Sequence, residues 1–323
     1  MKKRSKHRPT IGLVLSGGSV RGLSYIGLLK VFEEEKIPID YVAGTSIGAV
    51  IGAFYCAGMH AKEMESLVSK TKWEDFMDFT CQYDGLIDGK KIEGFIRDNL
   101  AIKSFEKLYT PFAAIAVDVN TGEEIIFRKG DVAEAVRASI SIPGVFTPVK
   151  IGHRTLVDGS IIDPVPIDAV KGKVDKIIAI DLSVPAEQYA NAKAVDGKDV
   201  TWLQFKTKLI TQEISNLRAY LKREHVFPSI FLRLLNPKYA LRLLQGKPLS
   251  NLPMFETVLK AHHLITNELT RLKLEENKPD LLIRIGITDA RFIEFDKFAY
   301  LIRRGEEATR KSLKDIKRLA KLP

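Results

Sequence analysis

Short apolar runs that alternate with helical patterns constrain the fold of this chain more than any other feature. A run of about four to eight apolar residues between turn residues is typical of a buried strand. Strands that alternate with helices assemble into a mainly parallel sheet with helices against its faces. We therefore predict an α/β fold with a mainly parallel central sheet. Strands are expected at residues 11–15, 41–43, 112–119, 155–157, 177–182 and 281–287, and a hairpin turn at residues 120–122.

Length and composition limit the class of protein. The 323 residues allow one α/β core with an additional region, and the fractions of hydrophobic (45%) and charged (28%) residues are typical of a soluble globular protein. No run reaches the roughly 18 apolar residues that a membrane-spanning helix needs. The basic start of the chain is followed by too short an apolar run for a signal peptide, and Cys56 lies in an apolar helical stretch. We expect a cytoplasmic protein.

The composition and the apolar pattern of the sequence change after residue 182, where a polar stretch is followed by a basic helical region. A sheet-like pattern returns only near residue 281. The expected parts are a basic N-terminal tail at residues 1–10, an α/β core at 11–185, a mainly helical basic insertion or cap at 186–275, and a closing strand and helix of the core at 276–323.

The net charge of +10 is concentrated in the N-terminal tail and in residues 201–250. A local concentration of this kind indicates an anionic partner for that part of the surface. Residues 201–250 interleave aromatic and aliphatic side chains with lysine and arginine, as in segments that lie on anionic lipid. An ordinary helical cap explains the same pattern, so both interpretations stay open. We do not expect nucleic acid as a partner, because no motif beyond charge supports it.

The first of two glycine-rich loops follows the strand at residues 11–15 and reads Gly17-Gly18-Ser19-Val20-Arg21-Gly22. Backbone N–H groups near a helix N-terminus can hold an anion or a developing oxyanion. A phosphate-binding loop needs a lysine where Leu23 stands. The dinucleotide fingerprint also fails, because the glycines occupy the wrong positions. An oxyanion hole and a structural turn remain as interpretations of this loop.

The second loop is Gly44-Thr45-Ser46-Ile47-Gly48, which follows the strand at residues 41–43. The spacing Gly-x-Ser-x-Gly is what a sharp strand-to-helix turn with an exposed serine requires. The helix that follows is rich in glycine and alanine, so it can pack closely against the sheet. Ser46 is therefore a candidate nucleophile. The alternative is that Ser46 only caps this helix.

A serine hydroxyl needs a base to remove its proton. None of the six histidines follows a strand of the expected core, since His153 precedes a strand and His262 and His263 belong to the helical insertion. Asp158, in the turn Asp158-Gly159 directly after the strand at residues 155–157, is the better candidate base. A turn aspartate that bonds to its own backbone is the competing interpretation.

In their order and spacing the two glycine loops, the stretch SIPGVFTPV at residues 141–149 and Asp158-Gly159 resemble the patatin-like phospholipases. The resemblance covers about residues 11–182 and implies a three-layer α/β/α fold. It also implies hydrolysis of lipid acyl esters by a Ser46–Asp158 dyad, without a metal or cofactor. The resemblance further implies an oxyanion hole from Gly17, Gly18, Ser19 and Ile47, with Arg21, Gly22, Gly44, Gly48 and Gly159 as supporting residues.

Two departures from the family pattern are Ser19, where a third glycine is usual, and Ser160, where glycine or alanine is commoner. We expect Ser19 to affect the rate of ester hydrolysis more than its mechanism. The expected partners are a phospholipid or another acyl ester and the inner membrane surface, approached through residues 201–250 and the N-terminal tail. A thioesterase or acyltransferase with the same site, and a non-catalytic lipid- or protein-binding module, are the alternatives.

Overall fold

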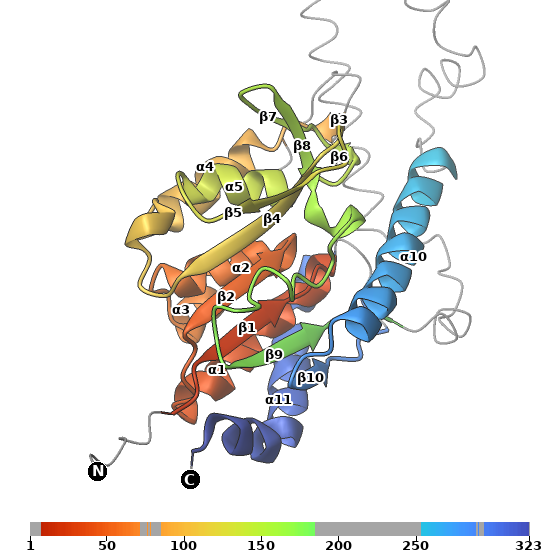
Figure 1. Ribbon diagram of the computed structural model, residues 1–323. Coiled ribbons are helices and arrows are strands. Elements are labelled where there is room, and N and C mark those ends of the chain that lie inside the picture. The colour runs from red at the N-terminus through yellow and green to blue at the C-terminus, as the bar shows by residue number, and fades with distance from the viewer. Residues whose placement is uncertain are drawn as a thin grey trace, which may run out of the picture. The chain divides into compact units, whose positions relative to one another are not determined.

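The computed structural model describes residues 8–71, 76, 78, 85–184, 253–288, 290 and 294–322 (Figure 1). The chain divides into two compact units, one of residues 1–192 with 261–323 and one of residues 193–260. Nearly all described residues belong to the first unit. Most of the predicted basic tail and the whole basic segment 201–250 lie outside the described residues. The expected membrane contact through them stays a prediction.

An eight-stranded sheet forms the centre of the first unit, with the order β10-β9-β1-β2-β4-β8-β7 and β5 paired with β4. The predicted α/β fold with a mainly parallel central sheet is confirmed. The parallel strands are β1 (Ile11–Leu15), β2 (Tyr41–Thr45), β4 (Phe112–Asp118), β9 (Lys176–Asp181) and β10 (Leu281–Arg284); the antiparallel ones are β5 (Glu124–Phe127), β7 (Val149–Ile151) and β8 (Arg154–Asp158); and β3 (Gly85–Ile87) pairs with β6 (Gly144–Phe146) in a separate sheet.

Side chains alternate along the strands between two cores, as the pleat of a strand requires. On β1, Leu13 and Leu15 enter the core that holds most of the helices, whereas Val14 enters the core on the opposite face. The opposite face is covered by residues 165–170 and by Leu274 of one long helix. The helices are α1 (Ser24–Glu34), α2 (Ile47–Cys56), α3 (Ala61–Lys70), α4 (Lys90–Asn99), α5 (Val132–Ser139), α10 (Pro253–Glu276) and α11 (Phe298–Ala320), with the 3-10 turns η1 (Ser19–Leu23), η3 (Phe105–Lys107), η4 (Gly159–Ile161) and η5 (Phe295–Lys297).

A search of the described part of the chain finds no helix that is both long and apolar enough to cross a bilayer.

The pairing registers place Asp158 level with the end of β2. Thr45 pairs with Ile115 across β2 and β4, and Ala116 pairs with Asp158 across β4 and β8. Ser46 follows Thr45, so it falls in the same row as Ala116 and Asp158. β8 runs antiparallel to β4, so the rule that parallel strands present functional groups at their carboxyl ends, which favoured Asp158 in the sequence, does not explain its position. Asp158 reaches the row because β8 ends part-way along β4.

Candidate active site

Ser46 lies in a sharp turn between β2 and α2, with φ 56° and ψ −124°. A serine rarely adopts such a backbone, and its cost is acceptable only where the surroundings fix it. Two glycines permit the close packing that does so. A Cβ on Gly44 would lie 2.3 Å from the carbonyl oxygen of Gly48, and one on Gly48 would lie 2.3 Å from that of Leu15. The Gly-x-Ser-x-Gly spacing therefore has a steric basis here.

The Ser46 hydroxyl donates a hydrogen bond to Asp158, with 2.6 Å between Oγ and Oδ2. The other carboxylate oxygen accepts the backbone N–H of Ser160 at 2.8 Å. Asp158 is fully buried. Burial raises the pKa of its carboxyl group, and a neighbouring histidine, Ser46 and Ser160 oppose that rise. The structure thus brings together the serine and the aspartate that the sequence singles out.

The C-terminal end of α5 holds both of these residues by their backbones. The Ser46 N–H donates to Oγ of Ser139 at 2.9 Å. The Asp158 N–H donates to the carbonyl oxygen of Ser141, also at 2.9 Å. Ser139 and Ser141 are fully buried. Two short backbone contacts to one rigid segment fix the separation of the hydroxyl and the carboxylate.

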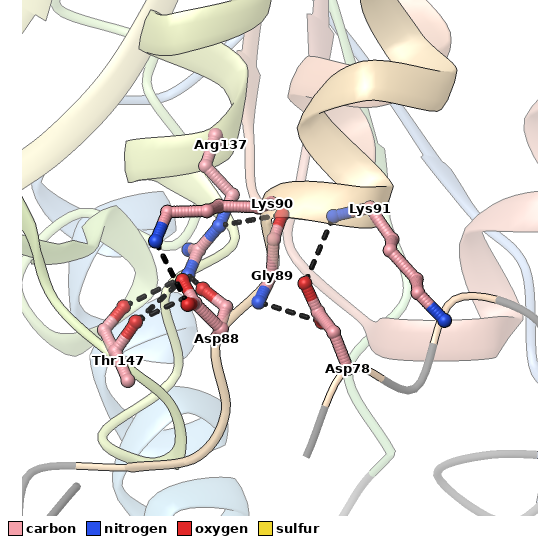
Figure 2. A network of polar contacts seen from close by, with 7 residues as sticks. All are labelled: Asp78, Asp88, Gly89, Lys90, Lys91, Arg137 and Thr147. Atoms are coloured by element: carbon pink, nitrogen blue, oxygen red, sulfur yellow. Dashed lines mark hydrogen bonds and ion pairs between the residues drawn. The ribbon is translucent and has the colours of Figure 1, made fainter. Parts of the chain in front are cut away.

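Arg137 in turn anchors this segment, and Figure 2 shows its bonds to Asp88, Gly89 and Thr147. Its guanidinium donates to Oγ of Ser141 at 2.5 Å, to the carbonyl oxygens of Gly89 and Thr147 at 3.1 and 2.9 Å, and to that of Asp88. The side chain is buried, and burial lowers the pKa of Arg137. A planar group with several donors suits a site where carbonyl oxygens converge. Arg137 therefore ties the start of α4 and β6 to the segment that holds Ser46 and Asp158.

Asp78 completes the network of Figure 2 from the other side. Its carboxylate accepts the backbone N–H groups of Gly89 and Lys91 at 2.8 and 2.9 Å. These N–H groups open α4 and have no partner within the helix. A carboxylate at this position stabilises the helix N-terminus.

The first glycine loop approaches the serine, and one of its N–H groups has an acceptor within the fold. The N–H of Gly17 donates to the carbonyl oxygen of Pro164 at 2.9 Å. The N–H groups of Gly18 and Ile47 have no acceptor among the residues that the structure describes. Ser19, where the family pattern has glycine, adopts the left-handed φ of 53°.

The supporting residues of the sequence motifs have steric or polar roles. A Cβ on Gly22 would lie 2.3 Å from the side chain of Ile47, and one on Gly159 would lie 2.5 Å from the carbonyl oxygen of Ile115. Arg21 is buried and donates from Nε to the carbonyl oxygen of Gly18 at 3.1 Å. Arg21 therefore braces the first loop.

A cleft that opens to solvent adjoins Ser46. His262 and His263 line it, although the sequence places them in the helical insertion. Both belong to the part of α10 that packs with the core unit, and their rings lie 3.4 Å from Oγ of Ser160 and 3.3 Å from Arg21. The full lining is Gly17, Gly18, Ser19, Arg21, Ser46, Ile142, Ser160, Pro164, Ser183, His262, His263, Thr266, Asn267 and Thr270.

His153 lies exposed in the turn between β7 and β8 and does not line the cleft. Among the described residues there is no group of three His, Cys, Asp or Glu side chains placed to hold a metal ion.

A second buried acid, Asp163, lies near Glu124 of β5. The sequence indicates only a turn residue here, yet neither carboxylate oxygen of Asp163 has a hydrogen-bond partner among the described residues. Burial, followed by the charge of Glu124, raises the pKa of Asp163 to about 7. Burial and a second negative charge nearby both favour the protonated form of a carboxyl group.

The Asp163 carboxyl group makes stability depend on pH in a defined direction. Its folded pKa lies above the unfolded value of about 3.9, so the folded chain binds the proton more tightly. The contribution is complete below about pH 4 and is lost as the pH rises towards 7. We expect Asp163→Asn to stabilise the protein at pH 8 by on the order of 1–3 kcal/mol. Thermal unfolding at pH 5 and pH 8 should show a smaller difference in Tm for the variant than for the wild type.

Asp98→Asn is the matched control, since Asp98 is exposed on α4 and does not contribute to the raised pKa of Asp163. It should keep the wild-type difference in Tm. A lower Tm of Asp163→Asn at pH 8, with an unchanged pH dependence, would contradict the raised pKa of Asp163.

Comparison with known proteins identifies relatives of the central part of the chain. Residues 13–171 match the family described as patatin-like phospholipase. An uncharacterized NTE family protein of Mycobacterium tuberculosis is 33% identical over 187 residues, which is 57% of this chain and 52% of that protein. Neuropathy target esterase sws of Drosophila melanogaster is 34% identical over 183 residues, 54% of this chain and 13% of that protein. The chain thus spans about half the length of the mycobacterial relative.

Two solved structures are also similar. VipD from Legionella pneumophila has a TM-score of 0.44 and 13% identity, covering 98% of this chain and 72% of that chain. The ExoU-SpcU complex from Pseudomonas aeruginosa has a TM-score of 0.44 and 14% identity, covering 96% of this chain and 52% of that chain.

Proposed function

We propose that the protein, whose residues 13–171 belong to the patatin-like phospholipase family, is a serine lipid acyl hydrolase with Ser46 as nucleophile and Asp158 as base. One observation carries the proposal: the Ser46 hydroxyl, held in a sharp turn, donates a 2.6 Å hydrogen bond to a fully buried carboxylate. A nucleophile and a base within hydrogen-bond reach are the signature of covalent acyl transfer.

In the proposed mechanism Ser46 attacks the carbonyl carbon of an ester while its proton passes to Asp158. The tetrahedral intermediate collapses when the bond to the leaving alcohol breaks, and Asp158 returns the proton to that alcohol. Water then attacks the acyl-serine, Asp158 takes the proton of the water, and the acid is released as Ser46 regains its hydrogen. Burial supports this role, because a raised pKa makes Asp158 a stronger base than an exposed carboxylate.

The oxyanion of the intermediate is proposed to bind the N–H groups of Gly18 and Ile47. Both lack an acceptor among the described residues, and Ile47 opens α2, so the dipole of that helix favours a negative charge there. Gly17 contributes differently, since its bond to Pro164 fixes the loop. Removing one such donor typically costs about 10²–10³ in rate.

A fluorophosphonate probe tests the proposed function directly, because it labels only an activated serine. We expect the full chain to be labelled, and Ser46→Ala to lose the label. The control is His153→Ala, which changes an exposed turn residue outside the cleft and should be labelled like the wild type. A panel of phospholipids, neutral glycerides and acyl thioesters then identifies the substrate class.

The alternatives give different results in the same experiments. Labelled protein that transfers acyl groups to an added alcohol or prefers thioesters would indicate an acyltransferase or thioesterase. Intact protein that folds yet takes no label would favour a non-catalytic binding module, for which the left-handed Ser19 in the first loop offers some basis.

A further inference from the structure

A histidine outside the recognised motifs lies on the far side of the candidate base. Nε2 of His262, on α10, is 3.4 Å from Oγ of Ser160. Ser160 donates its backbone N–H to Asp158 Oδ1 at 2.8 Å, and its side chain is among the groups that oppose the raised pKa of that carboxyl group. Ser160 and His262 line the same cleft as Ser46. Ser160 therefore contacts the carboxylate through its backbone N–H and the imidazole through its hydroxyl.

We propose that His262 and Ser160 are positioning residues for Asp158. Unprotonated His262 accepts a hydrogen bond from the Ser160 hydroxyl, and Asp158 therefore remains a strong base towards Ser46. This inference rests on the proposed function. A serine hydroxyl has one proton to donate. While that proton is engaged by His262, Asp158 receives hydrogen bonds only from Ser46 and from the Ser160 N–H. A carboxylate that accepts fewer hydrogen bonds is less stable in its charged form, so it takes up a proton more readily.

Protonation of His262 reverses the arrangement. An imidazolium ion has no acceptor, so Nε2–H donates to Oγ of Ser160, and the Ser160 hydroxyl turns its own proton to Asp158. The added hydrogen bond and the nearby positive charge both stabilise the carboxylate and weaken it as a base. The imidazole takes its proton from solvent, and no covalent bond changes. Acidification thus attenuates the site through protonation of His262 as well as of Asp158.

His263 and Arg21 are the other ionisable groups that line the cleft with His262. Burial lowers the pKa of His262 and raises that of Asp158, so the two approach each other. Burial lowers the pKa of His263 on α10 to about 3 and that of Arg21 on η1 to about 10, so the first stays neutral and the second stays charged from pH 4 to 8. The carboxylate of Asp181 on β9, which acts on Arg21, forms an ion pair with Arg284, with 3.2 Å between Oδ2 and Nε.

The pH dependence of kcat/KM distinguishes this role from a structural one. For the wild type we expect an acidic limb steeper than a single ionisation, because protonation of His262 and of Asp158 both reduce the rate. His262→Gln, which keeps a polar side chain but cannot titrate, should give a limb that fits one ionisation and a kcat about 3- to 10-fold lower at pH 8. Ser160→Ala should shrink the effect of His262→Gln, as residues acting through one another do.

The control is His153→Gln, the same substitution at an exposed histidine outside the cleft. It should superimpose on the wild type. A wild-type limb that fits one ionisation and coincides with that of His262→Gln would overturn the inference, as would additive effects of His262→Gln and Ser160→Ala.

A second measurement separates failure of this inference from failure of the proposed function. If no ester is hydrolysed in a Ser46-dependent manner, the proposed function fails. NMR titration of the His262 imidazole in the full chain still reports on the coupling. Asp158→Asn removes an attractive negative charge, so His262 should titrate at a measurably lower pH in that variant. An unchanged titration of His262 would overturn the inference whatever the activity.

Discussion

Asp158→Asn is expected to lower kcat for ester hydrolysis at least about 10⁴-fold while leaving the fold intact. Asparagine has nearly the same shape as aspartate and can still accept the N–H of Ser160 through its carbonyl oxygen. Its amide cannot take a proton from Ser46. Asp158 is the acceptor of the Ser46 hydroxyl among the described residues, so no other base is in place to replace it.

Steady-state kinetics of Asp158→Asn, Ser46→Ala and the double variant provide the test. A hydroxyl and a base that act as one unit give strongly non-additive losses, so the double variant should be no slower than Ser46→Ala alone. An unchanged thermal unfolding curve shows that the fold is kept. If Asp158→Asn retained a tenth of the activity while His262→Gln lost it, the base would be His262, and the dyad would be wrong.

Most of the sheet could be predicted from the sequence, because buried strands leave a local mark. β1 follows the predicted residues 11–15, β4 ends one residue before the predicted end, and β9 begins and ends one residue earlier than predicted. A central parallel strand is apolar on both faces, so its run of apolar residues is continuous. The direction of β8 could not be predicted, because partner and orientation depend on residues distant in the chain. Asp158 was therefore selected by a rule for parallel strands that does not apply to it.

The contact between Ser46 and Asp158 could also be predicted from the sequence. Glycines at fixed spacing mark backbone that must approach other backbone, and Gly44 and Gly48 do so here. Whether one backbone N–H is free or hydrogen-bonded could not be predicted in this way, because its acceptor is a carbonyl group from a distant segment of the chain. Nothing near Gly17 in the sequence indicates that Pro164 accepts its proton.

His262 was missed for a related reason. It is separated from Ser160 by 102 positions and lies in a helix that mixes acidic and basic residues and has only a weak apolar pattern. An amphipathic pattern reports which side of a helix is buried, and it does not report which loop that side faces. The one available signal was the departure Ser160 itself. A buried hydroxyl at a position where glycine or alanine is commoner needs a hydrogen-bond partner, and in the structure this partner is the imidazole of His262.

The second large effect concerns the fold. α1 and α11 pack at a distance that only glycine permits, although they lie at opposite ends of the chain. A Cβ on Gly27 would lie 1.9 Å from the carbonyl oxygen of Ile302, and one on Gly305 would lie 1.8 Å from that of Ser24. These atoms belong to helix backbones, so they cannot move aside as a side chain would. The two helices must separate to admit a methyl group.

Gly305→Ala is therefore expected to lower the free energy of unfolding by about 3 kcal/mol or more, at the upper end of overpacking effects. The substitution removes contacts along the whole pair of helices, because α11 also buries Leu301, Ile302 and Ile316 in the core. Urea unfolding of the full chain measures the change. Gly27→Ala should have a similar effect, and the double variant should be less than additive, because one separation of the helices accommodates both methyl groups.

Gly94→Ala is the matched control for this prediction. Gly94 also lies within a helix, α4, and a Cβ there would have no atom within 4 Å. Alanine is the better helix former by about 0.5–1 kcal/mol. The same substitution should thus stabilise the protein at position 94 and strongly destabilise it at position 305. Equal effects at the two positions would mean that helix propensity, rather than the close approach of α1 and α11, governs the result, and would contradict the packing described for these helices.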